Sequence, residues 1–380
     1  MIYLDNSATT KPFPEVLKSY TTVAAEYFGN PSSLHSIGGQ AENLLLQARK
    51  QIADLLQVKS SEIYFTSGGT EGNNFALKGI AHSYKGRGKH IITTAIEHDS
   101  IHNALEQLQN EGFSITYIPV DEEGIVSVEE VKRHIQKDTI LVSIMHVNNE
   151  IGSIQPVLQI GQMLKKHDSK IIFHVDGVQG VGKIPLSIKE AEIDLYTISA
   201  HKFHGLKGNG VLYIRQGLKL SPLLAGGGQE GNLRSGTENV PGAVSTAKAL
   251  RLQLQNQQEK LEKLIQLNQF LREQLQGIDD VIIHSPSNSV PHIINFSILG
   301  IKAEVFIHAL EEEELFISTT SACSSKKNKV SKTLVSMGVS KQAAESSFRM
   351  SLCYDNTLEE MQNTINIIAE TTKWLRGVMK

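Results

Sequence analysis

Short apolar runs alternate with segments of helical periodicity along the first part of the chain. An apolar run bounded by turn residues predicts a strand, and apolar residues spaced three or four apart predict an amphipathic helix. The predicted strands are 2–4, 63–66, 90–94, 139–147, 171–175, 193–198 and 211–214. The predicted helices are 15–27, 41–56, 73–82, 100–109 and 157–167. Because strands and helices alternate, we expect right-handed βαβ units and a mostly parallel sheet with helices on both faces.

The pattern changes after Thr237, where polar helical sequence replaces the alternation. A long helix is predicted over 241–275, followed by strands at 281–284 and 293–297 and a helix at 302–313. These shorter elements indicate a smaller C-terminal domain. We place the boundary inside the long helix near Gln257, so that the large domain covers 12–256.

The composition is that of an ordinary soluble protein, with 40% hydrophobic and 20% charged residues. A chain of 380 residues is long enough for two domains, and a net charge of −3 gives no indication of a nucleic-acid or membrane partner. With only two cysteines, Cys323 and Cys353, a disulfide framework is not expected. No apolar run approaches the length of a membrane span, and Met1 leads directly into a strand without a signal peptide. These features predict a cytoplasmic protein.

Polar residues that are able to take part in binding or catalysis follow the carboxyl ends of the predicted strands. They are Gly69 with Thr70, His98, Asn149, Asp176, Gln179 and Lys202. In open α/β sheets, ligands bind in the crevice outside those strand ends. Because structural residues alone would not gather at this position so consistently, the pattern predicts one ligand site at this edge of the sheet.

Lys202 lies between two predicted buried strands, 193–198 and 211–214. Partial desolvation lowers the pKa of a lysine and makes its neutral amine available for carbonyl chemistry. The alternative is a surface lysine in a glycine-rich turn, which is the more common environment of lysine. The gathering of polar residues at the strand ends favours the first interpretation.

The segment Ser67–Gly72 places glycines between a strand and a helix. The free N–H groups and the dipole of a helix N-terminus attract an anion, and Thr70 adds a hydroxyl. The segment matches neither the dinucleotide fingerprint nor the P-loop, and a plain tight turn remains an alternative.

Short motifs along the whole chain carry a resemblance. They are Tyr3–Thr10, Phe28–Ser33, Thr66–Glu71, Glu97–His98, His146–Gly152, His174–Gln179, Ser199–Lys202, Arg234–Thr237 and Ser321–Ser324. In combination they resemble the cysteine desulfurases, fold-type I pyridoxal-phosphate enzymes of the class-V aminotransferase superfamily that serve iron–sulfur assembly or tRNA thiolation. The resemblance implies an α/β fold: a large domain with a mostly parallel seven-stranded sheet between helices, and a smaller α+β domain. It also implies that residues 1–11 join 257–380 in the small domain.

The resemblance assigns roles to individual residues. Lys202 would bind pyridoxal 5′-phosphate covalently and move the α-proton of the substrate. Asp176 would pair with the pyridine nitrogen, although a turn aspartate is the structural alternative, and His98 would stack on the ring. Further cofactor contacts are implied for Gly69, Thr70, Asn149, Gln179, Ser199, His201 and Thr237. Thr237 would reach the site from the partner subunit of a homodimer. Asn149 and Arg349 would bind the carboxylate of the substrate L-cysteine, and no metal is implied.

Cys323 lies in a segment with little apolar content, 318–329, which predicts an exposed loop. Nearby lysines favour a thiolate, although exposed charges act weakly and an idle surface thiol is the alternative. The resemblance makes Cys323 catalytic: it would take sulfur as a persulfide, leave L-alanine, and pass the sulfur to an acceptor protein. Cys353 is predicted to be a small buried hydrophobe.

Three departures from the family pattern concern partner choice. Thr319-Thr320 stands where a Ser-Gly pair is common, Cys353–Asn356 replaces a more usual Gly-Arg-Phe-Thr, and the sequence stops soon after Trp374. Two rival functions remain at this point. One is a zinc hydrolase using His98, His102, His201 and His204. The other is a pyridoxal-phosphate protein of different outcome: an aminotransferase, a selenocysteine lyase or a non-catalytic sulfur carrier.

Overall fold

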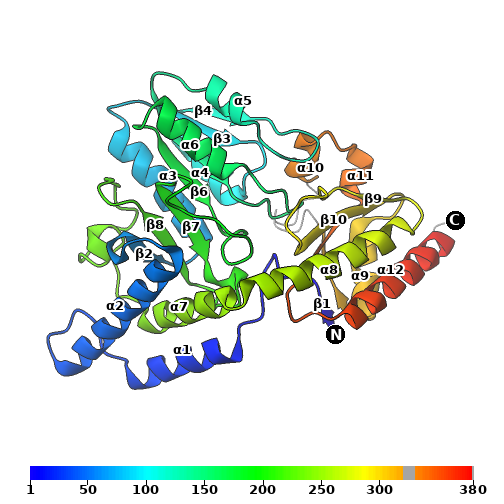
Figure 1. Cartoon of the computed structure of the whole chain (residues 1–380), viewed down its shortest axis with the longest axis horizontal. Coiled ribbons are helices and arrows are strands. Elements are labelled where there is room, and N and C mark those ends of the chain that lie inside the picture. The colour runs from blue at the N-terminus through cyan, green and yellow to red at the C-terminus, as the bar shows by residue number, and fades with distance from the viewer. Residues whose placement is uncertain (320–329, 379–380) are drawn as a thin grey trace.

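The computed structural model describes residues 1–319 and 330–378, and its largest element is a seven-stranded sheet (Figure 1). The strand order is β2-β8-β7-β6-β5-β3-β4. The strands are β2 (Ile63–Thr66), β3 (His90–Thr94), β4 (Ser114–Ile118), β5 (Thr139–Met145), β6 (Ile172–Asp176), β7 (Leu195–Ser199) and β8 (Gly210–Ile214). Neighbours from β4 to β7 are parallel, whereas β8 is antiparallel to both β2 and β7. The predicted mostly parallel seven-stranded sheet is confirmed.

Helices cover both faces of this sheet, because successive strand residues point to opposite sides. Ile91 of β3 packs in the core with α3 (Gly69–Tyr84) and α4 (Asp99–Asn110). Its neighbour Ile92 belongs to the core on the other face. Helices contributing to that second core are α1 (Pro14–Glu26), α2 (Ser36–Leu56), α5 (Val128–Arg133), α6 (Val157–His167) and α7 (Val240–Leu254). Short 3-10 turns occur at η1 (Ser60–Glu62), η2 (Ala200–Lys202) and η3 (Glu230–Asn232).

A four-stranded antiparallel sheet of order β12-β13-β10-β9 organises the C-terminal part. Its strands are β9 (Val281–Ile283), β10 (Ile293–Ile298), β12 (Ser318–Thr319) and β13 (Ser347–Ser351). The helices of this part are α8 (Gln257–Gln276), α9 (Ala303–Glu312), α10 (Lys332–Ser336), α11 (Lys341–Glu345) and α12 (Leu358–Val378). Its core contains Phe348, whose ring centroid lies 5.6 Å from that of Phe296 and 4.8 Å from that of Phe306.

The N-terminus crosses to this second part. Strand β1 (Ile2–Tyr3) pairs in parallel with β11 (Leu315–Phe316), and Leu4 is fully buried in the C-terminal core. The chain then leads toward the large sheet before α1 begins (Figure 1). We propose the domain division expected from the sequence, 12–256 against 1–11 with 257–380, on the strength of this pairing and the separate core.

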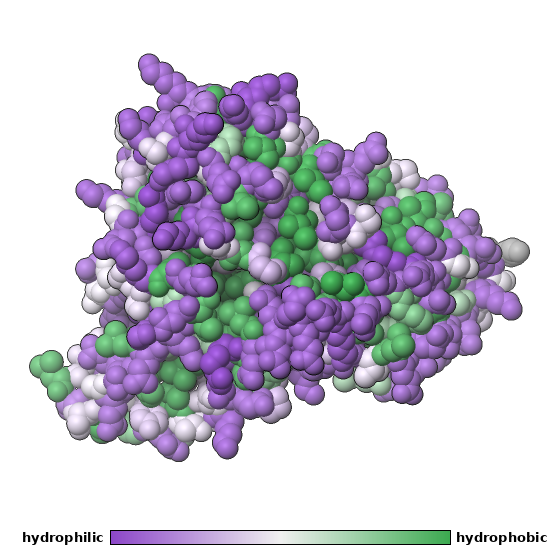
Figure 2. Space-filling model, viewed as in Figure 1, coloured by the Kyte–Doolittle hydropathy of each residue, from purple (hydrophilic) through white to green (hydrophobic). Residues whose placement is uncertain are grey.

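The predicted long helix over 241–275 is wrong, because the structure has two helices there. α7 ends at Leu254 and α8 begins at Gln257, and between them Asn256 adopts a left-handed φ of 54°. Asparagine tolerates that conformation better than most residues, but the surrounding Gln-rich sequence carries no other turn signal. The space-filling view shows many hydrophilic side chains over α8, in keeping with its polar composition (Figure 2).

Some elements were not predicted. β4 lies at the edge of the large sheet and is partly exposed, so its sequence contains no continuous apolar run. β13 is fully buried but includes two serines and Arg349, a composition that does not suggest a core strand. Among the described residues, no helix is both long and apolar enough to cross a membrane.

Candidate active site

A cavity of about 200 Å³ opens at the carboxyl ends of the parallel strands. Of the residues singled out in the sequence, it brings together Gly69, Thr70, His98, Asn149, Asp176, Gln179, Ser199, His201, Lys202 and Arg349. Ser7, Asn73 and Ser100 also line it, and none of these three was predicted. Because parallel strands end at the same edge of a sheet, residues from distant parts of the sequence meet here.

One end of the cavity is the N-terminus of α3. Gly68 has a φ of 151°, a conformation that a side chain would strain, and Gly69 and Thr70 are the first two helical residues. A Cβ atom on Gly69 would lie only 2.9 Å from Cγ2 of Val178, so glycine lets the helix approach the loop after β6. The unpaired N–H groups of this first turn and the hydroxyls of Thr70 and Ser199 make a site suited to a phosphate.

Asp176 ends β6 and is 5% exposed. Its Oδ2 accepts a hydrogen bond from Asn73 Nδ2 at 2.7 Å, and its Oδ1 accepts one from the N–H of Val178 at 3.0 Å. Hydrogen bonds to a carboxylate favour its charged form. Asp176 therefore presents a buried, hydrogen-bonded carboxyl group that is suited to pair with a protonated ring nitrogen.

His98 is the N-cap residue of α4, and its Nδ1 accepts a hydrogen bond from the N–H of Ser100 at 3.1 Å. The hydroxyl of Ser100 lies 2.9 Å from the same nitrogen and accepts a hydrogen bond from Asn73 Nδ2. Burial lowers the pKa of His98, while Asp176 opposes this effect. These contacts assign a neutral imidazole with its proton on Nε2. Asn73 therefore links Asp176 to His98 through Ser100. No sequence motif predicts this connection.

Lys202 follows β7 and is partly buried. Its Nζ donates hydrogen bonds to the carbonyls of Ser7 at 2.6 Å and Ala8 at 2.8 Å. Gln179 Nε2 donates to the same Ser7 carbonyl at 2.9 Å, and His201 Nδ1 lies 3.2 Å from the hydroxyl of Thr9. The N-terminal segment thus contacts the residues at the base of the cavity as well as the C-terminal core.

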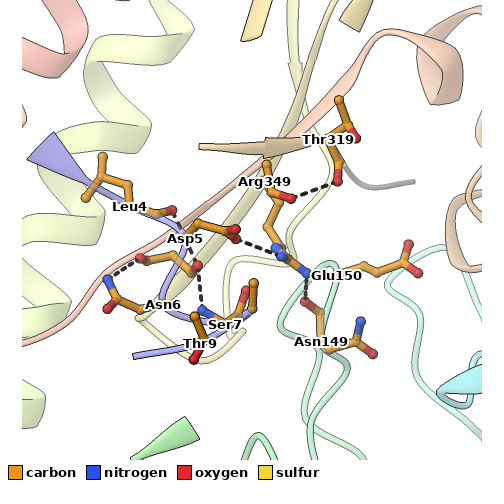
Figure 3. Close-up of polar contacts among 12 residues, drawn as sticks. Leu4, Asp5, Asn6, Ser7, Thr9, Asn149, Glu150, Thr319 and Arg349 are labelled. Carbon is orange, nitrogen blue, oxygen red and sulfur yellow. Dashed lines mark hydrogen bonds and ion pairs between the residues drawn. The ribbon is translucent and has the colours of Figure 1, made fainter. Parts of the chain in front are cut away.

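Arg349 comes from β13 and its side chain is 2% exposed. Its Nη1 donates to the backbone carbonyl of Asn149 at 3.0 Å, and its Nη2 contacts Asp5 Oδ1 at 2.9 Å (Figure 3). The Nε atom is buried and has no hydrogen-bond partner among the described residues. A buried guanidinium with donors to spare at the rim of a cavity is suited to bind a carboxylate. Asn149 contributes its backbone carbonyl to this arrangement. The sequence did not predict Asp5 as a partner of Arg349.

One predicted residue lies elsewhere. Thr237 lines a separate cavity of about 220 Å³ together with Arg234. Arg234 Nε donates to Glu71 Oε1 at 2.8 Å, so this second cavity is tied to the first turn of α3. Cys323 lies outside the described residues.

Cys353 and two histidines of the alternative zinc site, His102 and His204, have ordinary structural environments. Cys353 is half-buried, and burial raises the pKa of its thiol. His102 stacks on Tyr117 with ring centroids 5.6 Å apart, and His204 Nδ1 lies 2.8 Å from the carbonyl of Lys11. In residues 1–319 and 330–378, no group of three or more His, Cys, Asp or Glu side chains is placed to hold a metal ion.

The cavity fits pyridoxal 5′-phosphate at both ends. The start of α3 is suited to the phosphate, Asp176 to the ring nitrogen and the amine of Lys202 to the aldehyde carbon. Ser7 Oγ and Asn73 Oδ1 are buried in the cavity wall and have no hydrogen-bond partner in residues 1–319 and 330–378, as expected where a polar ligand belongs. Fold and cavity together are those of a fold-type I pyridoxal-phosphate enzyme.

Comparison with known proteins agrees with this class. The class-V aminotransferase family model matches residues 2–364. The NifS/IcsS protein homolog of Lactobacillus delbrueckii subsp. bulgaricus is 48% identical over 368 residues, covering 96% of this chain and 95% of that protein. Cysteine desulfurase IscS of Dictyoglomus turgidum is 43% identical over 379 residues, covering 99% and 96%. A solved NifS-like protein superposes with a TM-score of 0.93 at 38% identity, covering 98% of this chain and 99% of that one.

The chain belongs to the class-V aminotransferase family and, within it, to the cysteine desulfurases. Its cofactor is pyridoxal 5′-phosphate. The expectations for family, fold class and cofactor are confirmed. The roles of individual site residues remain predictions.

Glu97, the neighbour of His98, makes the stability of the protein depend on pH. Its Oε1 accepts hydrogen bonds from the Thr94 hydroxyl and the N–H of Met145, whereas its Oε2 is buried without a partner. Burial raises the pKa of Glu97 from 4.5 to about 8. Because the unfolded chain releases this proton near its ordinary pKa, the stabilising contribution is complete below that pKa and is lost as pH rises through about 8.

Replacing Glu97 by Gln removes this titration. We expect the free energy of unfolding, variant minus wild type, to become more positive between about pH 5 and 9 by an amount on the order of 4 kcal/mol, and the difference in melting temperature to rise with it. Scanning calorimetry at a fixed rate measures it. Glu106→Gln, an exposed change on the same helix α4, is the control and should show no such trend. A difference that stays constant with pH would contradict the assignment.

Proposed function

We propose that the cavity of Lys202, Asp176 and Arg349 is where this cysteine desulfurase removes sulfur from L-cysteine, with L-alanine as the second product. The main support for this proposal is that Arg349, a buried arginine with spare donors, lines the same cavity as the amine of Lys202 and the buried carboxyl group of Asp176. An α-amino acid needs these features: a cation for its carboxylate, and a reactive centre next to its amine.

The residues divide the work of binding. When bound, the cofactor supplies an electron sink that makes the α-proton of the amino acid acidic. Its phosphate would lie on Gly69, Thr70, Ser199 and His201, and Thr237 of the partner subunit would complete that end. Burial lowers the pKa of His201 to about 4, and its imidazole would contact the phosphate. Asp176 would hold the ring nitrogen, Gln179 the ring hydroxyl, and the imidazole of His98 the face of the ring.

Lys202 would carry the proton that leaves Cα of the substrate, while Arg349 and Asn149 hold its carboxylate. The thiolate of Cys323 then attacks the substrate sulfur. A sulfur–sulfur bond forms as the carbon–sulfur bond breaks, the electron pair stays on the carbon skeleton, and protonation releases alanine. The sulfur remains on Cys323 as a persulfide for an acceptor protein.

The acceptor and the compartment belong to the same proposal. Cysteine desulfurases serve iron–sulfur cluster assembly, and we extend the proposal to an acceptor of the cluster-scaffold or tRNA-thiolation kind. A chain with two cysteines, one of them the proposed nucleophile, needs that thiol reduced, which favours the cytoplasm. Nothing in its net charge of −3 favours direct binding of nucleic acid.

An assay of the purified protein separates the remaining functions. With L-cysteine and dithiothreitol we expect alanine and sulfide in about equal amounts, because each turnover breaks one carbon–sulfur bond. An aminotransferase would instead require a 2-oxo acid and release no sulfide. Activity confined to selenocysteine would assign a lyase, and no turnover by cofactor-loaded protein would indicate a sulfur carrier.

We propose an obligate two-fold homodimer. Thr237 lies outside the main cavity of its own chain, whereas Arg234 of the same loop donates a hydrogen bond to Glu71 at the start of α3. Co-expressing Lys202→Ala and Thr237→Val subunits tests this. If Thr237 acts across the interface, mixed dimers contain one intact site, and about one quarter of all sites recover activity at limiting cofactor. No recovery in the mixture, or full activity of a monomer in light scattering, would contradict the proposal.

A further inference from the structure

The turn after β5 contacts Arg349 through Asn149 and the start of α10 through the next residue, Glu150. Asn148 Oδ1 accepts hydrogen bonds from the N–H groups of Glu150 at 2.9 Å and Ile151 at 3.0 Å, which hold the turn in shape. Asn149 points its backbone carbonyl at Arg349, whereas the Glu150 carboxylate points away from that guanidinium (Figure 3).

The carboxylate of Glu150 meets the start of α10. Its Oε2 accepts a short hydrogen bond from the hydroxyl of Ser331. Ser331 is the N-cap residue of α10, and its Oγ accepts a hydrogen bond from the N–H of Leu334 at 3.1 Å. Asn148 Nδ2 adds a weaker contact to the hydroxyl of Thr333 at 3.4 Å. The turn is therefore held on α10 by two side chains.

The same turn is held on the C-terminal sheet. Asn295 Nδ2 donates to the backbone carbonyl of Glu150 at 3.2 Å, and Asn295 is paired with Arg349 across β10 and β13. The turn, the arginine and the cap of α10 therefore form one continuous set of contacts between the two parts of the chain. Arg349 lines the cavity from the side of the C-terminal sheet, whereas Lys202 and Asp176 line it from the side of the large sheet.

We propose that Glu150 is a positioning residue for the reaction: by binding Ser331 it holds the turn so that the Asn149 carbonyl orients Arg349 toward the substrate carboxylate. The inference rests on the proposed function, because it assumes that Arg349 binds that carboxylate. A planar guanidinium binds a carboxylate through two parallel N–H groups, so a small rotation of Arg349 weakens both bonds. Small displacements at such a site reduce rates considerably.

A purely structural role is the competing explanation, and the chain offers a matched control for it. α11 also has five residues and a serine cap, since Ser340 Oγ accepts a hydrogen bond from the N–H of Ala343 at 3.3 Å. Within the described residues, Ser340 binds no carboxylate. Removing either hydroxyl loses one helix cap, but only Ser331→Ala removes the contact with Glu150.

The experiment compares L-cysteine with L-cysteine methyl ester, which lacks the carboxylate charge. The wild-type holoenzyme is measured first, and absence of desulfuration there would refute the proposed function rather than the role of Glu150. The quantity followed is the ratio of kcat/KM for the two substrates. Glu150→Ala and Ser331→Ala should lower this ratio about tenfold, mainly through a higher KM for cysteine, with the cofactor spectrum unchanged.

Glu150→Gln should restore most of the ratio, because its amide oxygen still accepts the Ser331 hydroxyl. Ser340→Ala should also lower the melting temperature, through the loss of its helix cap, yet leave the ratio at the wild-type value. If Glu150→Ala does not fold, Ser331→Ala and Ser340→Ala alone decide the question. Equal effects on both substrates, or an equal change of the ratio in the two serine variants, would overturn the proposal.

Discussion

Lys202→Ala is expected to lower alanine production from L-cysteine by at least about four orders of magnitude, because one amine performs two tasks. In the proposed function it would bind the cofactor covalently and would also move the α-proton of the substrate. Its Nζ already lies among the Ser7 and Ala8 carbonyls at the base of the cavity. Those carbonyls hold the amine at this position, and among the described residues no other lysine lines the cavity.

Amino-acid analysis of timed reactions measures the loss. Borohydride reduction of the wild-type protein, followed by peptide mass spectrometry, should find a phosphopyridoxyl group on Lys202 and none in the variant. Lys207→Ala is the matched control, since this exposed lysine follows in the same glycine-rich turn. Residual turnover of Lys202→Ala within tenfold of the wild type, or label on another lysine, would refute the assignment.

Cys323→Ser should separate substrate binding from sulfur removal. A serine hydroxyl is a poor nucleophile toward sulfur and forms no persulfide, so we expect alanine and sulfide production to fall on the order of a thousandfold or more. The cofactor and the carboxylate site are untouched, and the variant should remain yellow and respond spectrally to L-cysteine. This prediction rests on the sequence and the family, because Cys323 lies outside the described residues.

Cys353→Ser is the control for that experiment. The half-buried thiol of Cys353 has a pKa raised by burial, which disfavours the reactive thiolate, so its loss should cost stability rather than activity. Persulfide trapping with an alkylating agent followed by mass spectrometry should find the extra sulfur on Cys323 only. Wild-type desulfuration by Cys323→Ser would contradict the persulfide mechanism and favour a direct lyase.

The position of the cavity was predictable because of a simple geometric rule. Parallel strands present their carboxyl ends at one edge of a sheet, so polar residues that follow β2, β3, β6 and β7 were expected to meet. The structure brings the residues named from that pattern into one cavity. Arg349 could not be found in this way, since its strand β13 lies in the other sheet.

Other site residues had no recognisable signal. Asn73 lies inside α3, where an asparagine usually indicates nothing, yet its amide bridges Asp176 and Ser100. Asp5 is distant in sequence from Arg349 and reaches it because Asp5 forms a parallel β-bridge with Ser351, which belongs to the same strand β13. Such partners depend on contacts between elements, and local pattern does not encode those contacts.

By itself, the sequence determined the alternation of strands and helices in the large domain, the mostly parallel sheet, the family and the cofactor. Hydrophobic periodicity and short motifs are local properties, so they can be recognised without knowing how the elements pack. Only the tertiary structure decided that Asn256 separates α7 from α8, that residues 7–9 contact Lys202 and His201, and that the turn of Asn149 and Glu150 contacts both Arg349 and the N-cap of α10. Each of these depends on the distance between side chains far apart in the sequence, and packing alone sets that distance.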